Sequence, residues 1–125
     1  MANLPDVASK AWDDHEGPVV LTTVDADGNP NAIYATCARK YGEDKLVVAD
    51  NYFDKTKANI LAGSKGSILY ITGDKKAYQV KGSLERQTEG PVFDDMKTWN
   101  PERLPGHAVA VLSIEEVYCG AEKLL

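Results

Sequence analysis

Hydrophobic and polar positions alternate over much of this chain, which is the pattern of strands that bury one face in a core. The segments 18–24 (PVVLTTV) and 45–49 (KLVVA) are rich in β-branched residues, as strands commonly are. In the long alternating segment 77–87, Gly82 predicts a bulge or a close approach of another backbone. We predict six strands, at residues 18–24, 31–41, 45–49, 67–72, 77–87 and 107–118.

Three other segments carry helix signals, either apolar residues at helical spacing or a helix start followed by glycine or proline. Turn sequences such as 25–30 (DADGNP) join most of the strands directly, with few helices between them. This order favours a small antiparallel barrel over a parallel α/β sheet. The expected fold is mainly β, a six-stranded antiparallel barrel with a few short helices at residues 5–15, 55–64 and 89–99.

The chain has 125 residues, 43% of them hydrophobic, which predicts one domain spanning residues 1–125. Its apolar runs fall far short of the ~20 residues of a membrane helix. The first ten residues lack the basic start and apolar stretch of a secretory signal, so we expect a cytoplasmic protein with no membrane partner. Cys37 and Cys119 are too far apart for a C-x-x-C motif and are expected to be half-buried thiols.

The segment 50–60 (DNYFDKTKANI) carries the clearest chemical signal in the sequence. A strand runs into a polar turn, and Lys55-Thr56 then opens a helix. An ammonium, a hydroxyl and the free N–H groups of a helix start together suit a phosphate. The alternative is that Asp54 caps an ordinary surface helix with solvated lysines. The G-x-x-x-x-G-K-[ST] spacing of nucleoside triphosphate sites is absent.

The distribution of charge along the chain favours one class of ligand over another. Residues 39–65 hold six basic and four acidic side chains, whereas the whole chain carries a net charge of −5. A locally basic segment in an acidic chain fits a small anion better than nucleic acid. No metal-ligand cluster and no G-x-S-x-G motif is present, so neither a metal site nor a hydrolase is expected. His15 lies in the acidic segment 12–16 and is expected at a solvated helix end, while His107 follows Pro105-Gly106 in a loop.

The order of these segments, with DKTKANI at 54–60, VKGS at 80–83 and EEVY at 115–118, resembles a known family over residues 17–125. It is similar to the pyridoxamine 5′-phosphate oxidase-like FMN-binding split barrels, and within them to the small FMN-binding proteins of sulfate-reducing bacteria. The resemblance implies a Greek-key split β-barrel, an FMN cofactor and a homodimer with the flavin at its interface. Residues near 104–107 and the C-terminal tail would reach the partner's cofactor.

The resemblance also implies roles for particular residues. Lys55 and Thr56 would hold the FMN phosphate. Tyr52 and Phe53 lie in the turn, where they would either face the planar ring or pack as ordinary aromatic residues. The implied cofactor-binding set is Tyr34, Ala35 and Thr36 beside the ring and ribityl chain, the backbone of Asp50, Asn51, Tyr52 and Phe53 along the ring, and Lys55 and Thr56 at the phosphate.

The implied function is electron or hydride transfer by an FMN flavoprotein, either an FMN-dependent oxidoreductase or a small electron carrier. The redox partner, the substrate and the catalytic residues are not identified by the sequence. The tail 118–125 (YCGAEKLL) lacks the Arg-x-His pair with which the oxidases bind pyridoxamine phosphate, so that substrate is not expected. Two alternatives stay open: a flavin storage or sensing module, and a related barrel that binds deazaflavin or haem, with His107 as the only candidate axial ligand.

Overall fold

The computed structural model describes residues 2–125, which form one curled sheet and three short helices. All strand pairs for which a register is defined are antiparallel. The helices are α1 (Asp6–Asp13), α2 (Lys55–Leu61) and α3 (Pro91–Trp99). The strands are β1 (Val19–Val24), β2 (Pro30–Ala35), β3 (Ala38–Tyr41), β4 (Lys45–Asp50), β5 (Lys65–Ile71), β6 (Ala77–Gln87), β7 (Ala108–Cys119) and β8 (Glu122–Lys123).

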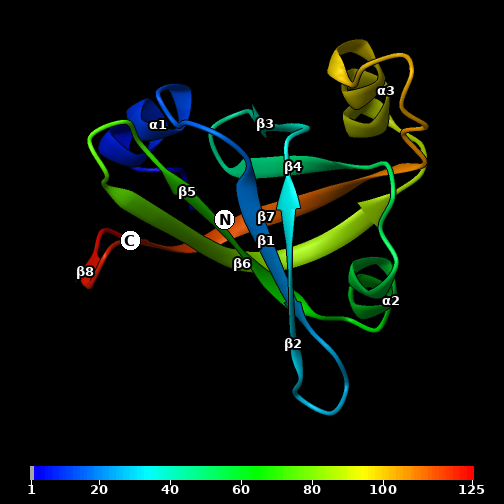
Figure 1. Ribbon diagram of the computed structural model, residues 1–125, viewed down its shortest axis with the longest axis horizontal. Helices are drawn as coiled ribbons and strands as arrows, with labels where there is room; N and C mark the ends of the chain where they lie inside the picture. Colours follow the sequence, from blue (N-terminus) through cyan, green and yellow to red (C-terminus); the bar gives the residue numbers. More distant parts are fainter. Residues whose placement is uncertain (1) are drawn as a thin grey trace.

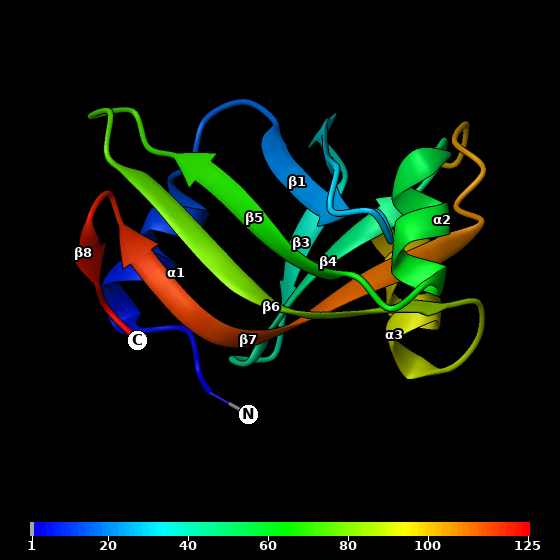
Figure 2. The same cartoon turned by 90° about the horizontal axis from the view of Figure 1, so that it is seen from below.

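The strands follow the order β2-β1-β5-β6-β7-β4-β3, and β8 pairs with β7. Figures 1 and 2 show how this sheet curls, with α1 at one end and α2 and α3 at the other. Strands β2 and β3 are consecutive in the chain yet stand at opposite ends of the hydrogen-bonded path. The prediction of a mainly β, antiparallel split barrel with a few short helices is confirmed.

The predicted number of six strands is wrong, because residues 31–41 do not form one strand. The chain bends at Thr36 and Cys37, where it leaves β1 and joins β4. At this bend the backbone N–H of Ala49 donates to the carbonyl of Cys37 at 2.9 Å. A short strand, β8, also follows the turn at Gly120. The other predicted elements agree with the structure within a few residues.

Two groups of buried side chains hold the sheet in this shape. The larger fills the barrel, where Leu21, Ile68, Val80 and Leu112 are completely buried. The smaller lies between the outer side of β4 and β7 and helix α3, whose Met96 is also completely buried. Strand β4 is therefore covered on both faces, and this explains why its sequence is apolar at successive positions rather than at alternate ones.

Gly82 lies in the pairing of β6 with β7, where the register shifts between Lys81 and Gly82. A Cβ atom at this position would collide with the carbonyl oxygen of Ser113. The predicted bulge and close backbone approach are both confirmed. None of the helices within residues 2–125 has the length and apolar character that crossing a membrane requires.

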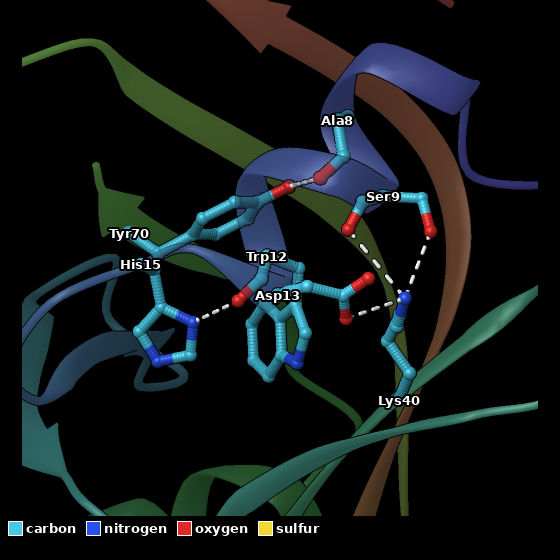
Figure 3. A network of polar contacts seen from close by, with 7 residues as sticks. All are labelled: Ala8, Ser9, Trp12, Asp13, His15, Lys40 and Tyr70. Carbon is cyan, nitrogen blue, oxygen red and sulfur yellow. Dashed lines mark hydrogen bonds and ion pairs between the residues drawn. The ribbon is translucent and has the colours of Figure 1, made fainter. Parts of the chain in front are cut away.

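Helix α1 closes one end of the barrel through aromatic packing (Figure 3). Trp12 packs edge to face on Tyr70, with 5.0 Å between ring centroids. The Tyr70 hydroxyl donates to the carbonyl of Ala8 at 2.8 Å. Burial raises the pKa of this phenol. The helix is thus attached to the barrel by a buried ring pair and a buried hydrogen bond.

Polar contacts at the rim of the same end complete the attachment (Figure 3). Lys40 Nζ donates to Ser9 Oγ at 2.9 Å and pairs with Asp13 at 2.8 Å. His15 is half-buried, with its Nδ1 2.5 Å from the Trp12 carbonyl and its ring 4.7 Å from the Trp12 ring. Because a carbonyl only accepts, Nδ1 carries the proton. The expectation of a solvated His15 is wrong, since the chain folds back after α1 and holds the ring against Trp12.

Candidate functional site

A cleft of about 450 Å³ opens where the β2–β3 bend, the loop after β4 and the segment after α3 meet. Six of the nine predicted cofactor-binding residues line it: Tyr34, Ala35, Thr36, Asn51, Tyr52 and Phe53. These residues come from two segments separated in sequence, and the closure of the barrel at β3 and β4 brings them to one place. The remaining lining residues are Ile33, Cys37, Ala49, Arg103 and Leu104.

The other three predicted residues lie beside or beneath this cleft. Lys55 is exposed at the first position of α2, two residues beyond Phe53. Thr56 is buried, and its Oγ1 accepts a hydrogen bond from Asn31 Nδ2 at 3.1 Å. This bond ties the start of α2 to strand β2. Asp50 is buried at the end of β4.

Asp50 organises the loop that follows it. Its Oδ2 accepts from Arg86 Nη2 at 2.8 Å and from Nε at 2.9 Å, while its Oδ1 accepts from the Phe53 backbone N–H at 3.0 Å. The backbone N–H of His107 donates to the Asp50 carbonyl at 2.9 Å. The side chains of Asp50 and Arg86 are only 2% and 10% exposed. A buried carboxylate with both oxygens bonded fixes the turn, because losing either partner would leave an uncompensated charge.

A second buried pair ties the same loop to the end of α3. Asn51 Nδ2 donates to Asn100 Oδ1 at 3.0 Å, and Asn100 Nδ2 donates to Asn51 Oδ1 at 2.9 Å. Asn51 Oδ1 also accepts from the Gly106 backbone N–H at 2.9 Å. The cleft wall is therefore held by hydrogen bonds whose polar atoms are satisfied inside the protein.

Two tyrosine rings stand open to solvent at the cleft. Tyr34 is 78% exposed and Tyr52 is 77% exposed, whereas Phe53 is half-buried. Aromatic residues of this kind offer flat apolar faces with a polar tip. Asp54 occupies the N-cap position of α2 without a side-chain capping bond, so the alternative of a simple capped helix lacks its characteristic hydrogen bond.

Sequence reasoning missed four lining residues and expected a fifth, Leu104, near the cofactor of a partner chain. Ile33, Cys37 and Ala49 read as ordinary strand or bend positions, and nothing in their neighbours marks them as facing a cleft. Arg103 comes from a segment about fifty positions away from the Lys-Thr turn, so only the folded chain reveals its place. Leu104 belongs to the stretch expected near a partner's cofactor, and it lines the cleft of its own chain. The exposed His107 is not a lining residue.

Residues 8–119 match the family model of pyridoxamine 5′-phosphate oxidase. The chain belongs to this family. Within residues 2–125, no group of three or more His, Cys, Asp or Glu side chains is placed to bind a metal.

Proteins similar to this chain align with most of its length. An uncharacterized protein of Methanocaldococcus jannaschii is 30% identical over an alignment of 106 residues, and the match covers 80% of this chain and 70% of that protein. The crystal structure of HupZ from Group A Streptococcus has a TM-score of 0.80 at 23% identity, covering 97% of this chain and 94% of that chain. An FMN-binding protein from Syntrophomonas wolfei has a TM-score of 0.75 at 24% identity, covering 87% and 80%. The two structures establish the shared fold.

Proposed function

We propose that the cleft binds FMN and that the protein is a flavoprotein that transfers electrons or hydride. One observation carries most weight: the cleft of this family member joins Tyr34, Ala35 and Thr36 with Asn51, Tyr52 and Phe53, the two segments expected along a flavin. The name of the Syntrophomonas wolfei relative, an FMN-binding protein, supports the same cofactor.

The residues present suit this cofactor. A cleft of about 450 Å³ is within the usual range of ligand sites, roughly 300–1,000 Å³. Its lining is uncharged apart from one arginine, as a flat, largely apolar ring requires. Tyr34 and Tyr52 offer exposed ring faces, and the buried bonds of Asp50 and Asn51 keep the loop backbone in one conformation. Bound FMN would supply the redox chemistry, and the protein would bind, orient and tune it.

Lys55 and Thr56 are our candidates for the phosphate. The Lys55 ammonium is exposed beside the cleft, with no ion pair to another described residue, and is available for a charge-assisted bond. The Thr56 hydroxyl accepts from Asn31, and among the described residues its own proton has no acceptor. It would therefore act as a donor toward the phosphate.

We also propose a homodimer with the flavin at the interface. A single chain leaves Tyr34 and Tyr52 more than three-quarters exposed, and a second copy would cover them and the open side of the ring. Two-fold pairing is the commonest assembly. Sedimentation of the FMN-loaded protein should give a dimer, and a monomer that keeps its flavin at low concentration would refute this arrangement. We infer a cytoplasmic location, because the half-buried cysteines Cys37 and Cys119 are free thiols, as a reducing compartment favours.

The decisive experiment is equilibrium dialysis of the purified protein against excess FMN, followed by an absorption spectrum. We expect about one flavin per chain. A protein that retains no flavin absorption would exclude the proposed cofactor, and a Soret band or a deazaflavin spectrum on the protein as purified would favour those cofactors instead. Retained FMN that is neither reduced by NADH or NADPH nor, once reduced, reoxidised by added electron acceptors would favour a storage or sensing module.

A further inference from the structure

Among residues 2–125, Arg103 is the only charged residue that lines the cleft. It is exposed, and among the described residues it takes part in no ion pair and no side-chain hydrogen bond. Its acidic neighbour Glu102 lines a separate hollow with residues 97–101 and Leu104. The Arg103 guanidinium therefore has no bonded partner at the wall of an otherwise uncharged cleft.

The segment that carries Arg103 is fixed at both ends. Asn100 at its start and the Gly106 backbone near its end both bind the side chain of Asn51, which itself lines the cleft. From the outer side, Lys97 Nζ donates to the carbonyls of Pro105 and Gly106 at 3.1 and 3.3 Å.

Gly106 shows how closely this segment is packed. Its φ of +52° lies in the left-handed region, and an added Cβ would approach Asn100 Nδ2 to 3.0 Å. A segment tied at both ends in this way holds Arg103 at the cleft instead of leaving it on a mobile loop.

The two cations near the cleft occupy different positions. Lys55 opens α2 and is not a lining residue, whereas Arg103 faces the cleft itself. In the proposed site, Lys55 holds the phosphate of FMN. A second, separate cation is then left for a second molecule that shares the cleft with the flavin.

We propose that Arg103 is a specificity-determining residue that selects a small, negatively charged molecule as the reaction partner of the flavin. The planar fork of a guanidinium matches the paired oxygens of a carboxylate, sulfonate or phosphate, and it binds them in bidentate fashion. This inference rests on the proposed flavin site. It names the chemical class that the site accepts: an anionic substrate or electron acceptor small enough to enter beside the ring.

The test uses two probes with the same ring system and different charge, naphthalene-2-sulfonate and naphthalene-2-sulfonamide. Each is titrated into the FMN-loaded protein, and binding is followed through the visible absorption band of the flavin. We expect Arg103→Gln to weaken sulfonate binding about tenfold, the effect of losing one charge-assisted contact, and to leave sulfonamide binding unchanged. The sulfonate affinity of Arg103→Lys should lie between those of wild type and Arg103→Gln, because lysine keeps the charge and lacks the planar fork.

Arg39→Gln is the matched control, since it removes the same charge from a guanidinium that lies 5.0 Å from the Trp99 ring centroid and outside the cleft lining. It should leave the binding of both probes unchanged. Raising the salt concentration should reduce the preference for sulfonate in wild type and leave Arg103→Gln nearly unaffected.

FMN and riboflavin affinities of each variant separate this inference from the proposed function. Equal sulfonate binding by wild type and Arg103→Gln, with FMN still bound, would overturn the role of Arg103 and leave the flavin site standing. A loss of FMN affinity in Arg103→Gln without a loss of riboflavin affinity would mean that Arg103 holds the cofactor phosphate. That result would also overturn the proposal that Arg103 selects an anionic reaction partner. Failure of wild type to retain FMN would remove both proposals.

Discussion

The two ends of the barrel use the same kinds of side chain in opposite ways. At the α1 end, Trp12 and Tyr70 are 5% and 2% exposed and pack edge to face. At the cleft end, Tyr34 and Tyr52 are 78% and 77% exposed. Aromatic rings stabilise the fold where they are buried and stay available to a ligand where they are not. Exposure, more than residue type, therefore separates the structural end of this barrel from its candidate functional end.

The pairs of polar side chains show the opposite pattern: they are partly exposed at the α1 end and buried at the cleft end. The ion pair of Lys40 with Asp13 lies at a partly exposed rim, where such contacts contribute little. The pairs of Asp50 with Arg86 and of Asn51 with Asn100 are buried around the cleft. The cleft end thus gains rigidity from buried pairs of polar side chains, and the α1 end from packing together with one buried hydrogen bond, from Tyr70 to Ala8. Variants should separate these two sources.

The largest effect should come from Trp12→Ala at the closed end. Removing a buried tryptophan side chain costs about 3–5 kcal/mol of the free energy of unfolding, measured by urea denaturation. FMN affinity of the folded fraction should stay unchanged. Tyr34→Ala is the counterpart at the open end: its stability should change by about 0.5 kcal/mol or less, while FMN affinity falls. If Trp12→Ala weakened FMN binding as much as Tyr34→Ala, the two ends would not be independent.

Lys55→Ala should give the largest effect on cofactor affinity. Loss of a charge-assisted contact to the phosphate should lower FMN affinity about tenfold to a hundredfold and leave riboflavin affinity unchanged. Lys57→Ala removes the same charge two positions further along α2 and serves as the control in the same fluorescence titrations. Equal losses for FMN and riboflavin would indicate that Lys55 supports the ring pocket and that the phosphate lies elsewhere.

Asn100→Ala tests the buried polar bonds of the cleft end. It leaves the Asn51 amide without one buried donor and one buried acceptor, at a cost of about 1–3 kcal/mol in unfolding free energy. FMN affinity should fall as well, since Asn51 lines the cleft. Tyr70→Phe removes one buried hydrogen bond at the other end and should leave FMN affinity unchanged. A destabilised Asn100→Ala that binds FMN like wild type would show that the amide pair has no part in positioning the ligand.

Tyr70→Phe should give the smallest effect at neutral pH, about 0.5–1.5 kcal/mol for the hydrogen bond to Ala8. Burial raises the pKa of Tyr70 above its ordinary value near 10, with Tyr78 and Cys119 adding to the shift. The unfolded chain therefore loses this proton first, and wild type loses stability as pH rises above about 10. The variant lacks that titration, so the gap between the two unfolding free energies should shrink in alkaline buffer. A gap that stays constant above pH 10 would contradict this account.

Local sequence signals predicted most of the fold. The β-branched runs, the glycine in β6 and the polar turn before Lys55 each act within a few residues, and each was predicted correctly. The bend at Thr36 and Cys37 was missed because it contains neither glycine nor proline. Its cause is a change of partner strand, which depends on residues far along the chain.

In the candidate site, too, features with a local sequence signal were predicted and features set by long-range pairing were not. The loop carrying Tyr52 and Phe53 can be recognised from its composition, and both residues line the cleft. The residues that hold this loop in place cannot be recognised from local sequence. Arg86 lies 36 positions from Asp50, and Asn100 lies 49 positions from Asn51. Pairings over such distances are set by the topology of the sheet, so a single sequence cannot predict them.

The two-residue bend between β2 and β3 also links the two end strands of the sheet. Among the described residues, β2 pairs only with β1 and β3 pairs only with β4, so each has one edge without a strand partner. We therefore expect the amide protons of β2 and β3 to exchange fastest among the strands of this path. A molecule seated in the cleft touches both β2 and the loop after β4. It would act as a clasp, slowing exchange together on β2 and β4, which lie far apart in the strand order of the sheet.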